Sequence, residues 1–384
     1  MSSIEPASVQ SPAAFSLSQT GATSAAAAKA HFPILDGLRG VAAFMVIIFH
    51  LLEAVYPDYA LHPVHHGYLA VDFFFLLSGF VVGYAYDDRW GAMSVKDFFR
   101  IRLIRLQPLV VLGVLLGLVV FLIDPYNTAP KSGGLIALTT LLSLLLLPGP
   151  DIRGWGETHP LNGPCWSLLQ EYIANIAYAL LLRKLANKTL WFVVIVCAVA
   201  LCVTASRLPN IGTGWSYGTF WIATVRMAFP FVAGLLLFRS RRTIRIRWAF
   251  PLCALALVVV FLLPAAPRGN GLLDAALVLF IFPAIVAAGA GGAVGARMGR
   301  ICSLLGRMSY PVYILHYPFI YTYTAWVYTS KPAPSTVALV ASGLFVLFVL
   351  LAWVALRYFD EPLRAWLGAR FRRQALASNK LINQ

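Results

Sequence analysis

Long apolar runs recur along most of this chain, separated by short polar or basic segments. The runs cover residues 34–56, 67–86, 108–123, 133–147, 165–182, 189–205, 219–238, 248–264, 273–290, 308–328 and 335–356. Most are near the length that an α-helix needs to cross about 30 Å of hydrocarbon. The pattern predicts an all-α fold, a polytopic bundle of transmembrane helices in a lipid bilayer.

The basic segments orient these runs, because Lys and Arg near the ends of spans mark the cytoplasmic side. These segments are 89–105, 183–188, 239–247, 297–307 and the residues after 357. Three apolar runs separate the first two segments, although only an even number of crossings returns the chain to the same side. We therefore expect the shortest run, 133–147, to be a re-entrant or half-buried helix. About ten spans remain in the inner (plasma) membrane, with both termini cytoplasmic and the 148–164 loop outside.

Composition agrees with this class of protein, since 60% of the residues are apolar, 12% are charged and the mean hydropathy is +0.77. The 30 basic residues exceed the 15 acidic ones, but they cluster between apolar runs, which indicates membrane topology and no nucleic-acid partner. The five cysteines include no CxxC pair, so neither a disulfide framework nor a zinc site is indicated. Nothing in the pattern reveals the oligomeric state.

Three segments are expected along the chain. Residues 1–30 are rich in Ser and Ala and lack the basic start and apolar core of a secretory signal, so we expect a disordered cytoplasmic tail. A membrane domain over 31–358 and a basic cytoplasmic tail over 359–384 follow. At their boundary the motif FDEPLR, 359–364, is predicted to end the final helix and to form local ion pairs.

Two ionisable residues, Arg39 and His50, lie eleven positions apart in the first apolar run. On an ideal helix their side chains fall within about 20° of one another and roughly 16 Å apart along the axis. An ionisable residue inside a span normally faces a water-filled cavity or a partner. The alternative is that each one anchors an end of the span at the interface.

The motif VDFFFLLSGF, 71–80, brings Asp72 into a very apolar helix. Gly79 and Gly83 are spaced for close helix packing. A carboxylate in this setting needs a partner or access to water, so Asp72 is a candidate for substrate contact.

Arg102 and Arg105 lie three residues apart in FFRIRLIRLQP, on one helical face, with Pro108 expected to open the next span. Two forked guanidinium groups at a cytoplasmic surface suit phosphate groups, of a nucleotide-bearing donor or of lipid. Simple positive-inside anchoring is the alternative.

Two later motifs carry further candidates. PCWSLLQEY, 164–172, contains Glu171, the only carboxylate of its apolar run, five residues after Trp166. An isolated carboxylate there is either protonated or paired with a cation, and both arrangements serve acid–base chemistry. The motif LGRMSYPVYILHYP, 305–318, contains His316. This histidine either binds substrate or is hydrogen-bonded to a neighbouring helix in a purely structural role. Trp166 and His316 join Asp72 as candidates for substrate binding.

In this order the motifs resemble the acyltransferase 3 family of integral-membrane O-acyltransferases, which acetylate bacterial surface polysaccharides. The resemblance extends from LDGLRG at 35 to EPLR at 361. It implies transfer of an acyl group, usually acetyl from acetyl-CoA, to a saccharide hydroxyl. Arg39 and His50 match the family's Arg-x10-His, Arg102 and Arg105 its RxxR, and Glu171 the glutamate after Trp-Ser-Leu. Some relatives carry a periplasmic hydrolase-like domain, whereas only 357–384 follow the last run here, so we expect a stand-alone membrane module.

The expected chemistry assigns a role to each candidate. An alcohol needs a base to attack a thioester, and a neutral His is suited to this at neutral pH, so His50 is the candidate base. Arg39, roughly 16 Å away along the helix, is expected to hold the donor's phosphates with Arg102 and Arg105. Glu171 is expected on the outer side, orienting His50 or activating the acceptor. This chemistry requires no metal.

Two other function classes stay open at this stage. A transporter or flippase for a glycan would also be polytopic with buried charges, but should show two similar halves, and none is evident. A membrane scaffold or sensor would not need an aligned Arg and His. The sequence does not identify the acceptor or the acyl group that is transferred. In the 148–164 loop, Trp155, Glu157, His159 and Asn162 could touch a sugar or could equally form an ordered surface turn.

Overall fold

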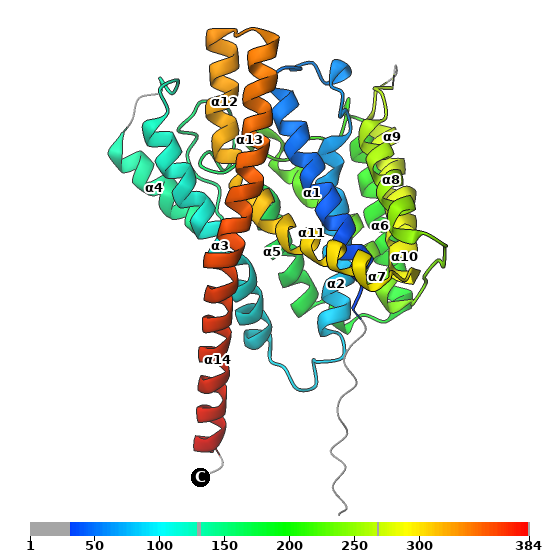
Figure 1. The fold of residues 1–384 in the computed structure, drawn as a ribbon. Coiled ribbons are helices and arrows are strands. Elements are labelled where there is room, and N and C mark those ends of the chain that lie inside the picture. Colours follow the sequence, from blue (N-terminus) through cyan, green and yellow to red (C-terminus); the bar gives the residue numbers. More distant parts are fainter. Residues whose placement is uncertain (1–30, 129–131, 267–268, 383–384) are drawn as a thin grey trace, which may run out of the picture. The chain divides into compact units, whose positions relative to one another are not determined.

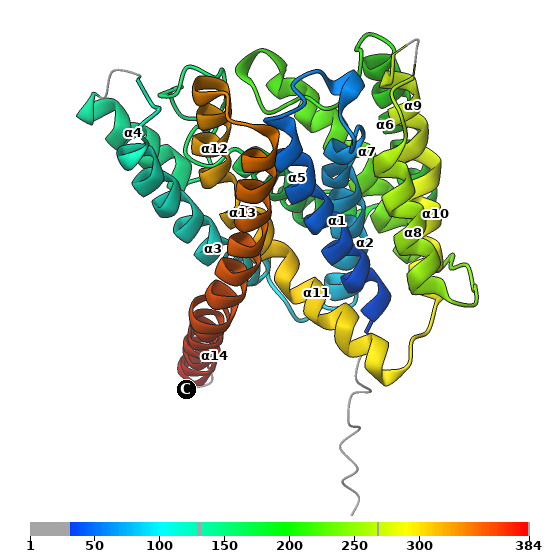
Figure 2. The same cartoon turned by 45° about the horizontal axis from the view of Figure 1, so that its top comes forward.

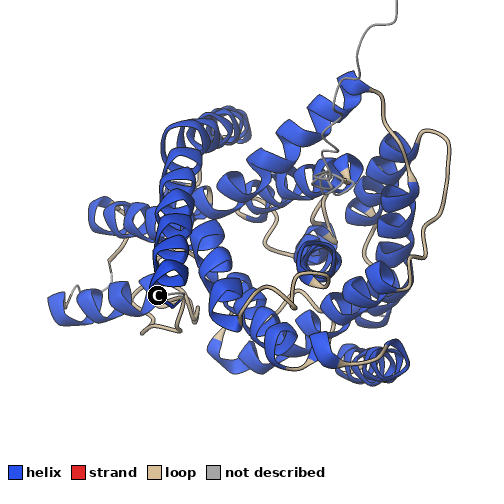
Figure 3. Ribbon diagram, turned by 90° about the horizontal axis from the view of Figure 1, so that it is seen from below, coloured by secondary structure: helices blue, strands red, loops and turns tan. Residues whose placement is uncertain are grey.

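The computed structural model describes residues 31–128, 132–266 and 269–382, with side chains as far as Phe371. All regular secondary structure in these ranges is helical, as the colouring of Figure 3 shows. The predicted all-α class is therefore confirmed. The expectation for the tail over 1–30 lies outside the described residues.

Fourteen α-helices follow one another in the described ranges (Figure 1). They are α1 (Pro33–Glu53), α2 (Ala70–Tyr86), α3 (Val95–Ile123), α4 (Gly133–Leu144), α5 (Cys165–Leu180), α6 (Asn187–Ala205), α7 (Phe220–Arg239), α8 (Ala249–Leu262), α9 (Gly271–Ala276), α10 (Phe282–Gly291), α11 (Ala296–Leu315), α12 (Tyr317–Ser330), α13 (Pro334–Val354) and α14 (Glu361–Ile382). Two π-helical segments, Leu277–Ile281 and Ala355–Asp360, join α9 to α10 and α13 to α14.

Seven helical stretches of the described chain are long and apolar enough to cross a membrane. They are Pro33–Glu53, Gly67–Tyr86, Val95–Ile123, Asn187–Ala205, Tyr217–Arg239, Gly271–Gly291 and Pro334–Phe371. The apolar helices α4 and α8 are shorter. The 12 residues of α4 span only about 18 Å, less than the hydrocarbon thickness, as expected for a helix that does not cross on its own. The protein is a multi-pass membrane protein.

Two predicted helix boundaries were wrong. Pro108 does not open a span but lies inside α3, which begins at Val95 behind a capping box of Ser94 and Asp97. The run 308–328 is not one helix, since α11 ends at Leu315 and α12 begins at Tyr317 in a new direction (Figure 2). Pro318 follows this break and has no N–H to continue the α11 ladder.

The motif FDEPLR does not end the last helix. The π-helical segment Ala355–Asp360 joins α13 directly to α14, because Pro362 falls in the first turn of α14, where its missing N–H costs little (Figure 1). The expected local ion pair does form, between Arg364 and Asp360 at 2.9 Å. Glu361 instead pairs with Arg307 of α11 at 2.5 Å.

Close helix packing sets the frame of the bundle. A Cβ atom at Gly79 of α2 would lie 1.9 Å from the carbonyl oxygen of Phe231 in α7, and one at Gly234 of α7 would lie 2.0 Å from that of Leu76. Side chains at these positions would force the backbones apart, which confirms the predicted close approach at Gly79. The oblique helix α11 packs against α1 in a similar way (Figure 2).

The 148–164 loop is not a surface turn. Its second half is buried, with Glu157, Thr158, His159 and Leu161 each at most 5% exposed. Backbone hydrogen bonds tie it to the 211–217 segment, including one of 3.0 Å from Thr158 N to the carbonyl of Trp215. The loop therefore enters the bundle, and α5 begins inside the bundle with the buried Cys165 and Trp166.

Candidate functional site

Two cavities lie along α1. The larger, about 590 Å³, surrounds His50 near the end of α1 and is called here the histidine cavity. The smaller, about 210 Å³, surrounds Arg39 near the start of α1 and is called the arginine cavity. The predicted Arg39 and His50 thus face cavities, as an ionisable residue in a span is expected to do.

His50 is oriented by a carboxylate that sequence reasoning missed. Its Nδ1 lies 2.9 Å from Oε2 of Glu53, one turn further along α1, and Tyr59 donates to the other oxygen of Glu53 at 2.7 Å. A proton on Nδ1 satisfies this contact and leaves Nε2 with a lone pair on the cavity side. Both His50 and Glu53 line the cavity. The available signal was the acidic residue three positions after a histidine on one helix.

His316 supports His50 rather than lining the cavity. The two imidazole rings are stacked, with centroids 5.5 Å apart and planes inclined by 29°. His316 is fully buried, and its Nδ1 lies 3.1 Å from the carbonyl oxygen of Val312, to which it can donate. Its Nε2 is buried without a hydrogen-bond partner in the described part of the chain. The prediction that His316 binds substrate is therefore not supported by its position, whereas the other predicted aromatic, Trp166, does line the histidine cavity.

Glu157 contributes a second carboxylate to the histidine cavity. Tyr321 donates a short hydrogen bond to its Oε2, and the hydroxyl of Tyr317 lies 3.5 Å from Oε1. Burial raises the pKa of Glu157 to about 7, although the Tyr321 hydrogen bond and the charge of Arg153 act in the opposite direction. This group can hold or release a proton near neutral pH.

Of the other loop residues singled out, Trp155 and His159 also line the histidine cavity. His159 contacts the carbonyl oxygen of Leu146 through Nε2 at 3.3 Å, and burial lowers its pKa to about 4, so its ring is neutral at pH 7. Asn162 instead donates to the carbonyl of Ile314 at 2.9 Å and ties the loop to α11.

Asp72 does not line either cavity. It is fully buried in a bidentate ion pair with Arg226 of α7, whose Nη2 lies 2.5 Å and Nε 3.2 Å from the two carboxylate oxygens. Arg226 also donates to the carbonyls of Thr213 and Tyr68 and reaches the cavity wall. The predicted substrate contact of Asp72 is replaced by a structural one, which holds Arg226 in place.

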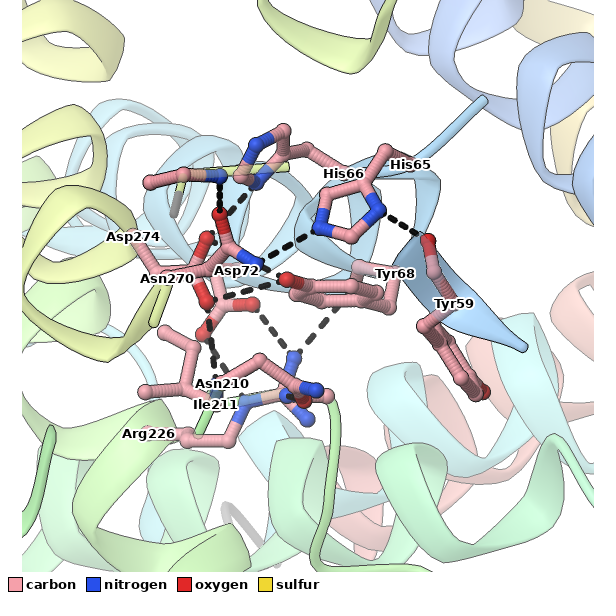
Figure 4. A network of polar contacts seen from close by, with 12 residues as sticks. Tyr59, His65, His66, Tyr68, Asp72, Asn210, Ile211, Arg226, Asn270 and Asp274 are labelled. Atoms are coloured by element: carbon pink, nitrogen blue, oxygen red, sulfur yellow. Dashed lines mark hydrogen bonds and ion pairs between the residues drawn. The ribbon is translucent and has the colours of Figure 1, made fainter. Parts of the chain in front are cut away.

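This ion pair belongs to a larger buried network, drawn in Figure 4. Asp274 of α9 accepts hydrogen bonds from Tyr68 and from the backbone N–H of Ile211, and lies 2.7 Å from Nδ1 of His66. Asn270 links the same region to His65 at 2.7 Å. The network fixes the wall of the histidine cavity against α7 and α9.

The arginine cavity gathers the three predicted basic residues. Arg39 donates to Ser309 at 2.9 Å and to the carbonyl of Gly306 at 2.8 Å, and pairs with Asp36 at 3.1 Å. Arg102 and Arg105 also line this cavity, so the structure brings all three together as expected.

The position of Glu171 corrects the prediction. It lies in the arginine cavity, where it forms a short ion pair with Arg102 and accepts a hydrogen bond of 3.1 Å from Ser78. It is therefore not beside His50. The reason is the buried 148–164 loop, which starts α5 inside the bundle and moves Glu171 toward the arginines.

The arginine cavity holds more positive charge than its carboxylates neutralise. Arg105 forms no hydrogen bond or ion pair within the described residues, and Nε of Arg102 is buried there without a partner. At the cavity rim, Arg307 pairs with Glu361 and Arg364 with Asp360. Arg105 is half-buried, and a partly desolvated cation without a bonded counter-charge favours an anion in the space beside it.

Val71 and Tyr313 line both cavities. Tyr313 is held by a hydrogen bond of 2.7 Å between its hydroxyl and Ser167, which in turn donates to the carbonyl of Pro164. The two cavities therefore adjoin at this pair of side chains. In the described ranges no three His, Cys, Asp or Glu side chains converge as metal ligands would.

Comparison with known proteins places this geometry in context. The family model described as an acyltransferase domain matches residues 32–357. "Protein 2 in picA locus" of Rhizobium radiobacter is 34% identical over 188 residues, which cover 46% of this chain and 95% of that protein. "Acyltransferase MdmB" of Streptomyces mycarofaciens is 30% identical over 236 residues, which cover 55% of this chain and 58% of that protein. No solved structure matches.

Proposed function

The chain belongs to the acyltransferase domain family, and on that premise we propose that it transfers an acetyl group from acetyl-CoA to a hydroxyl of a saccharide. We place the enzyme in the inner membrane, with the arginine cavity open to the cytoplasm and the histidine cavity to the outer side. The observation that carries this proposal is the contact of a basic cavity and a histidine cavity at Val71 and Tyr313.

The donor binds in the arginine cavity. Phosphate groups of coenzyme A supply the anion that Arg105 and the Nε of Arg102 lack, through charge-assisted hydrogen bonds. Arg39 lines the same cavity, where Ser309 and Gly306 hold its guanidinium. Glu171 keeps Arg102 in position through their ion pair, so it acts on the donor side and not on the acceptor.

The acyl group reaches the second cavity past Val71 and Tyr313. A pantetheine arm is unbranched and thin over most of its length, and the separation of Arg39 from His50 along α1 is roughly 16 Å. Binding the nucleotide end at the arginines therefore places the thioester close to His50. The rigid helix α1 sets this distance.

His50 acts as the general base. Its Nε2 takes the proton of the acceptor hydroxyl while the hydroxyl oxygen attacks the thioester carbon, and Glu53 stabilises the imidazolium that forms. The carbon–sulfur bond then breaks, and His50 returns the proton to the leaving coenzyme A sulfur. Stacking on His316 keeps the imidazole in the orientation that both steps need.

The shape and lining of the histidine cavity favour a saccharide acceptor. Aromatic side chains cover much of its wall, and their faces pack well against the C–H face of a sugar ring. They are Phe49, Tyr59, Tyr68, Trp155, Trp166, Trp215, Tyr313, Tyr317 and Tyr328. The carboxylate of Glu157 offers an acceptor for sugar hydroxyls.

Transfer of label tests this function. Membranes that contain the protein are incubated with acetyl-CoA labelled in the acetyl group, and O-acetyl label in envelope glycans is counted. We expect incorporation by the wild type and none above background for His50→Ala at equal expression. Equal incorporation by both would remove His50 from the chemistry. Absence of label in both would contradict acetyl transfer from acetyl-CoA to envelope saccharides.

A further inference from the structure

The charged side chains of the histidine cavity are mainly acidic. Glu53 and Glu157 both line it. Among the nearby cationic groups, Arg226 is neutralised by its bidentate pair with Asp72, and His159 is held neutral by burial. Arg153 acts on Glu157 without lining the cavity, and it pairs with Asp124 at 3.6 Å. The cavity in which the acceptor reacts therefore carries the opposite charge to the arginine cavity.

Glu157 is built to receive a ligand. Its carboxylate lines the cavity from a buried loop that an antiparallel bridge ties to Ser216, and the hydrogen bond from Tyr321 holds the side chain. Tyr321 occupies Oε2, but the Tyr317 hydroxyl is 3.5 Å from Oε1, the outer limit of a hydrogen bond. Oε1 keeps capacity for a donor in the cavity.

The surroundings of Glu157 favour a cation. Trp155 lies on the same loop, and Trp215 lies on the segment that the loop is hydrogen-bonded to; both line the cavity. Aromatic faces attract ammonium groups, and a partly desolvated carboxylate pairs with them strongly. A carboxylate or phosphate on the ligand would meet the charge of Glu53 and the ionised form of Glu157, whereas an ammonium group beside Glu157 stabilises that ionised form.

We propose that Glu157 is a specificity-determining residue of the histidine cavity, which favours an acceptor bearing an ammonium group near the reacting hydroxyl and rejects an anionic one. This inference rests on the proposed acetyl transfer and names the class of saccharide that the same site accepts. Amino sugars are the favoured acceptors of the histidine cavity. Neutral sugars are accepted less well, and uronic acids are excluded.

Three acceptors on one scaffold test the inference: methyl glucosaminide, methyl glucoside and methyl glucuronide. Ester formation from labelled acetyl-CoA is measured at neutral pH, with label counted after mild alkaline release so that amides do not contribute. For the wild type we expect kcat/KM to fall at least tenfold from the amino to the neutral glycoside and again to the glucuronide. Binding is read independently from quenching of the tryptophan fluorescence of the purified protein.

Two variants distinguish a specific role of Glu157 from a general effect of negative charge on that side of the protein. Glu157→Gln keeps an acceptor for Tyr321 but removes the charge, so it should bring the three kcat/KM values to within about threefold of one another. Asp58→Asn removes an exposed carboxylate of the same side that does not line the cavity, and it should leave the wild-type order intact.

Each outcome decides a different point. A glucuronide used as well as the glucosaminide, or an unchanged order in Glu157→Gln, would overturn the role of Glu157 while leaving acetyl transfer in place. If Glu157→Gln is poorly folded, fluorescence quenching by the three glycosides in the wild type still decides, because equal affinities would overturn the charge selection. Absence of transfer to all three glycosides, with fluorescence quenching in the predicted order, would count against the proposed function and in favour of the binding preference.

Discussion

The carboxylate of Glu53 lies 2.9 Å from Nδ1 of His50, one turn away on the same helix. Because both residues belong to α1, the pairing does not depend on how the other helices pack. Tyr59 holds the second oxygen of Glu53, so the carboxylate cannot turn away from His50 without losing a hydrogen bond. This arrangement fixes which ring nitrogen of His50 faces the acceptor.

Replacing Glu53 by Gln should therefore slow the chemical step. We expect kcat to fall by about 10²-fold, the range of general acid–base effects, with KM for acetyl-CoA nearly unchanged because the donor binds elsewhere. Steady-state kinetics with purified protein measure both. A rise in KM for the acceptor without a loss of kcat would mean that Glu53 binds the acceptor rather than orienting His50.

Arg105 should matter for donor affinity. Arg105→Gln removes a cation that has no bonded counter-charge in the described structure, so KM for acetyl-CoA should rise by about 10- to 100-fold, as expected for charged hydrogen bonds worth ~1.5–3 kcal/mol. Arg105→Lys should recover part of this loss. Arg89→Gln, which alters an exposed residue of the same basic segment, is the control. Equal effects of Arg105→Gln and Arg89→Gln would point to membrane charge instead of a binding site.

Breaking the pair of Asp72 and Arg226 should destabilise the protein. Asp72→Asn leaves a buried guanidinium without its counter-charge and should cost about 3–5 kcal/mol, seen as a lower midpoint of thermal unfolding in detergent. The double variant Asp72→Leu with Arg226→Met should be more stable than Asp72→Asn. If Asp72→Asn unfolds at the wild-type temperature, Asp72 does not have the structural role assigned here.

Two loop residues should oppose each other in the pH dependence of stability. The pKa of Glu157 is raised by burial to about 7, so its contribution to stability is present below its unfolded pKa and is lost as pH rises toward 7. The pKa of His159 is lowered to about 4, so its contribution is gained as pH rises from about 4 to 6.5.

Glu157→Gln removes only the first of these effects. The difference in thermal unfolding midpoint between Glu157→Gln and the wild type should shift steadily in favour of the variant between pH 5 and 7. Above pH 8 this difference should stay constant. A difference between the two proteins that does not vary with pH would show that Glu157 has an ordinary pKa.

The sequence predicts which ionisable residues belong to the site, but it does not predict which residues they contact. The helical spacing of Arg39 and His50 is a property of one helix, so it could be read from the chain, and the RxxR motif has the same advantage. The partner of Asp72 could not be found in this way, because Arg226 lies 154 positions later on another helix.

Glu171 was misplaced for a different physical reason. Topology based on apolar runs assumes that a loop between two spans stays near the surface, and the 148–164 loop is buried instead. The same assumption left open whether Glu157 touches a sugar or lies in a surface turn. The helix break at His316 and the continuous passage from α13 into α14 also depend on packing and local proline placement, which hydrophobic periodicity does not record.

The passage between the cavities is the central claim, and a size series at Val71 tests it most directly. Val71→Ala widens the junction, whereas Val71→Phe narrows it without touching the arginines or His50. In Val71→Phe we expect acetyl transfer to fall by about 10²-fold or more, the cost of misplacing a reacting group, while coenzyme A binding stays within about threefold of wild type. Val71→Ala should retain transfer. Full transfer by a folded Val71→Phe protein would contradict the passage, and loss of coenzyme A binding together with transfer would contradict the separation of the two sites.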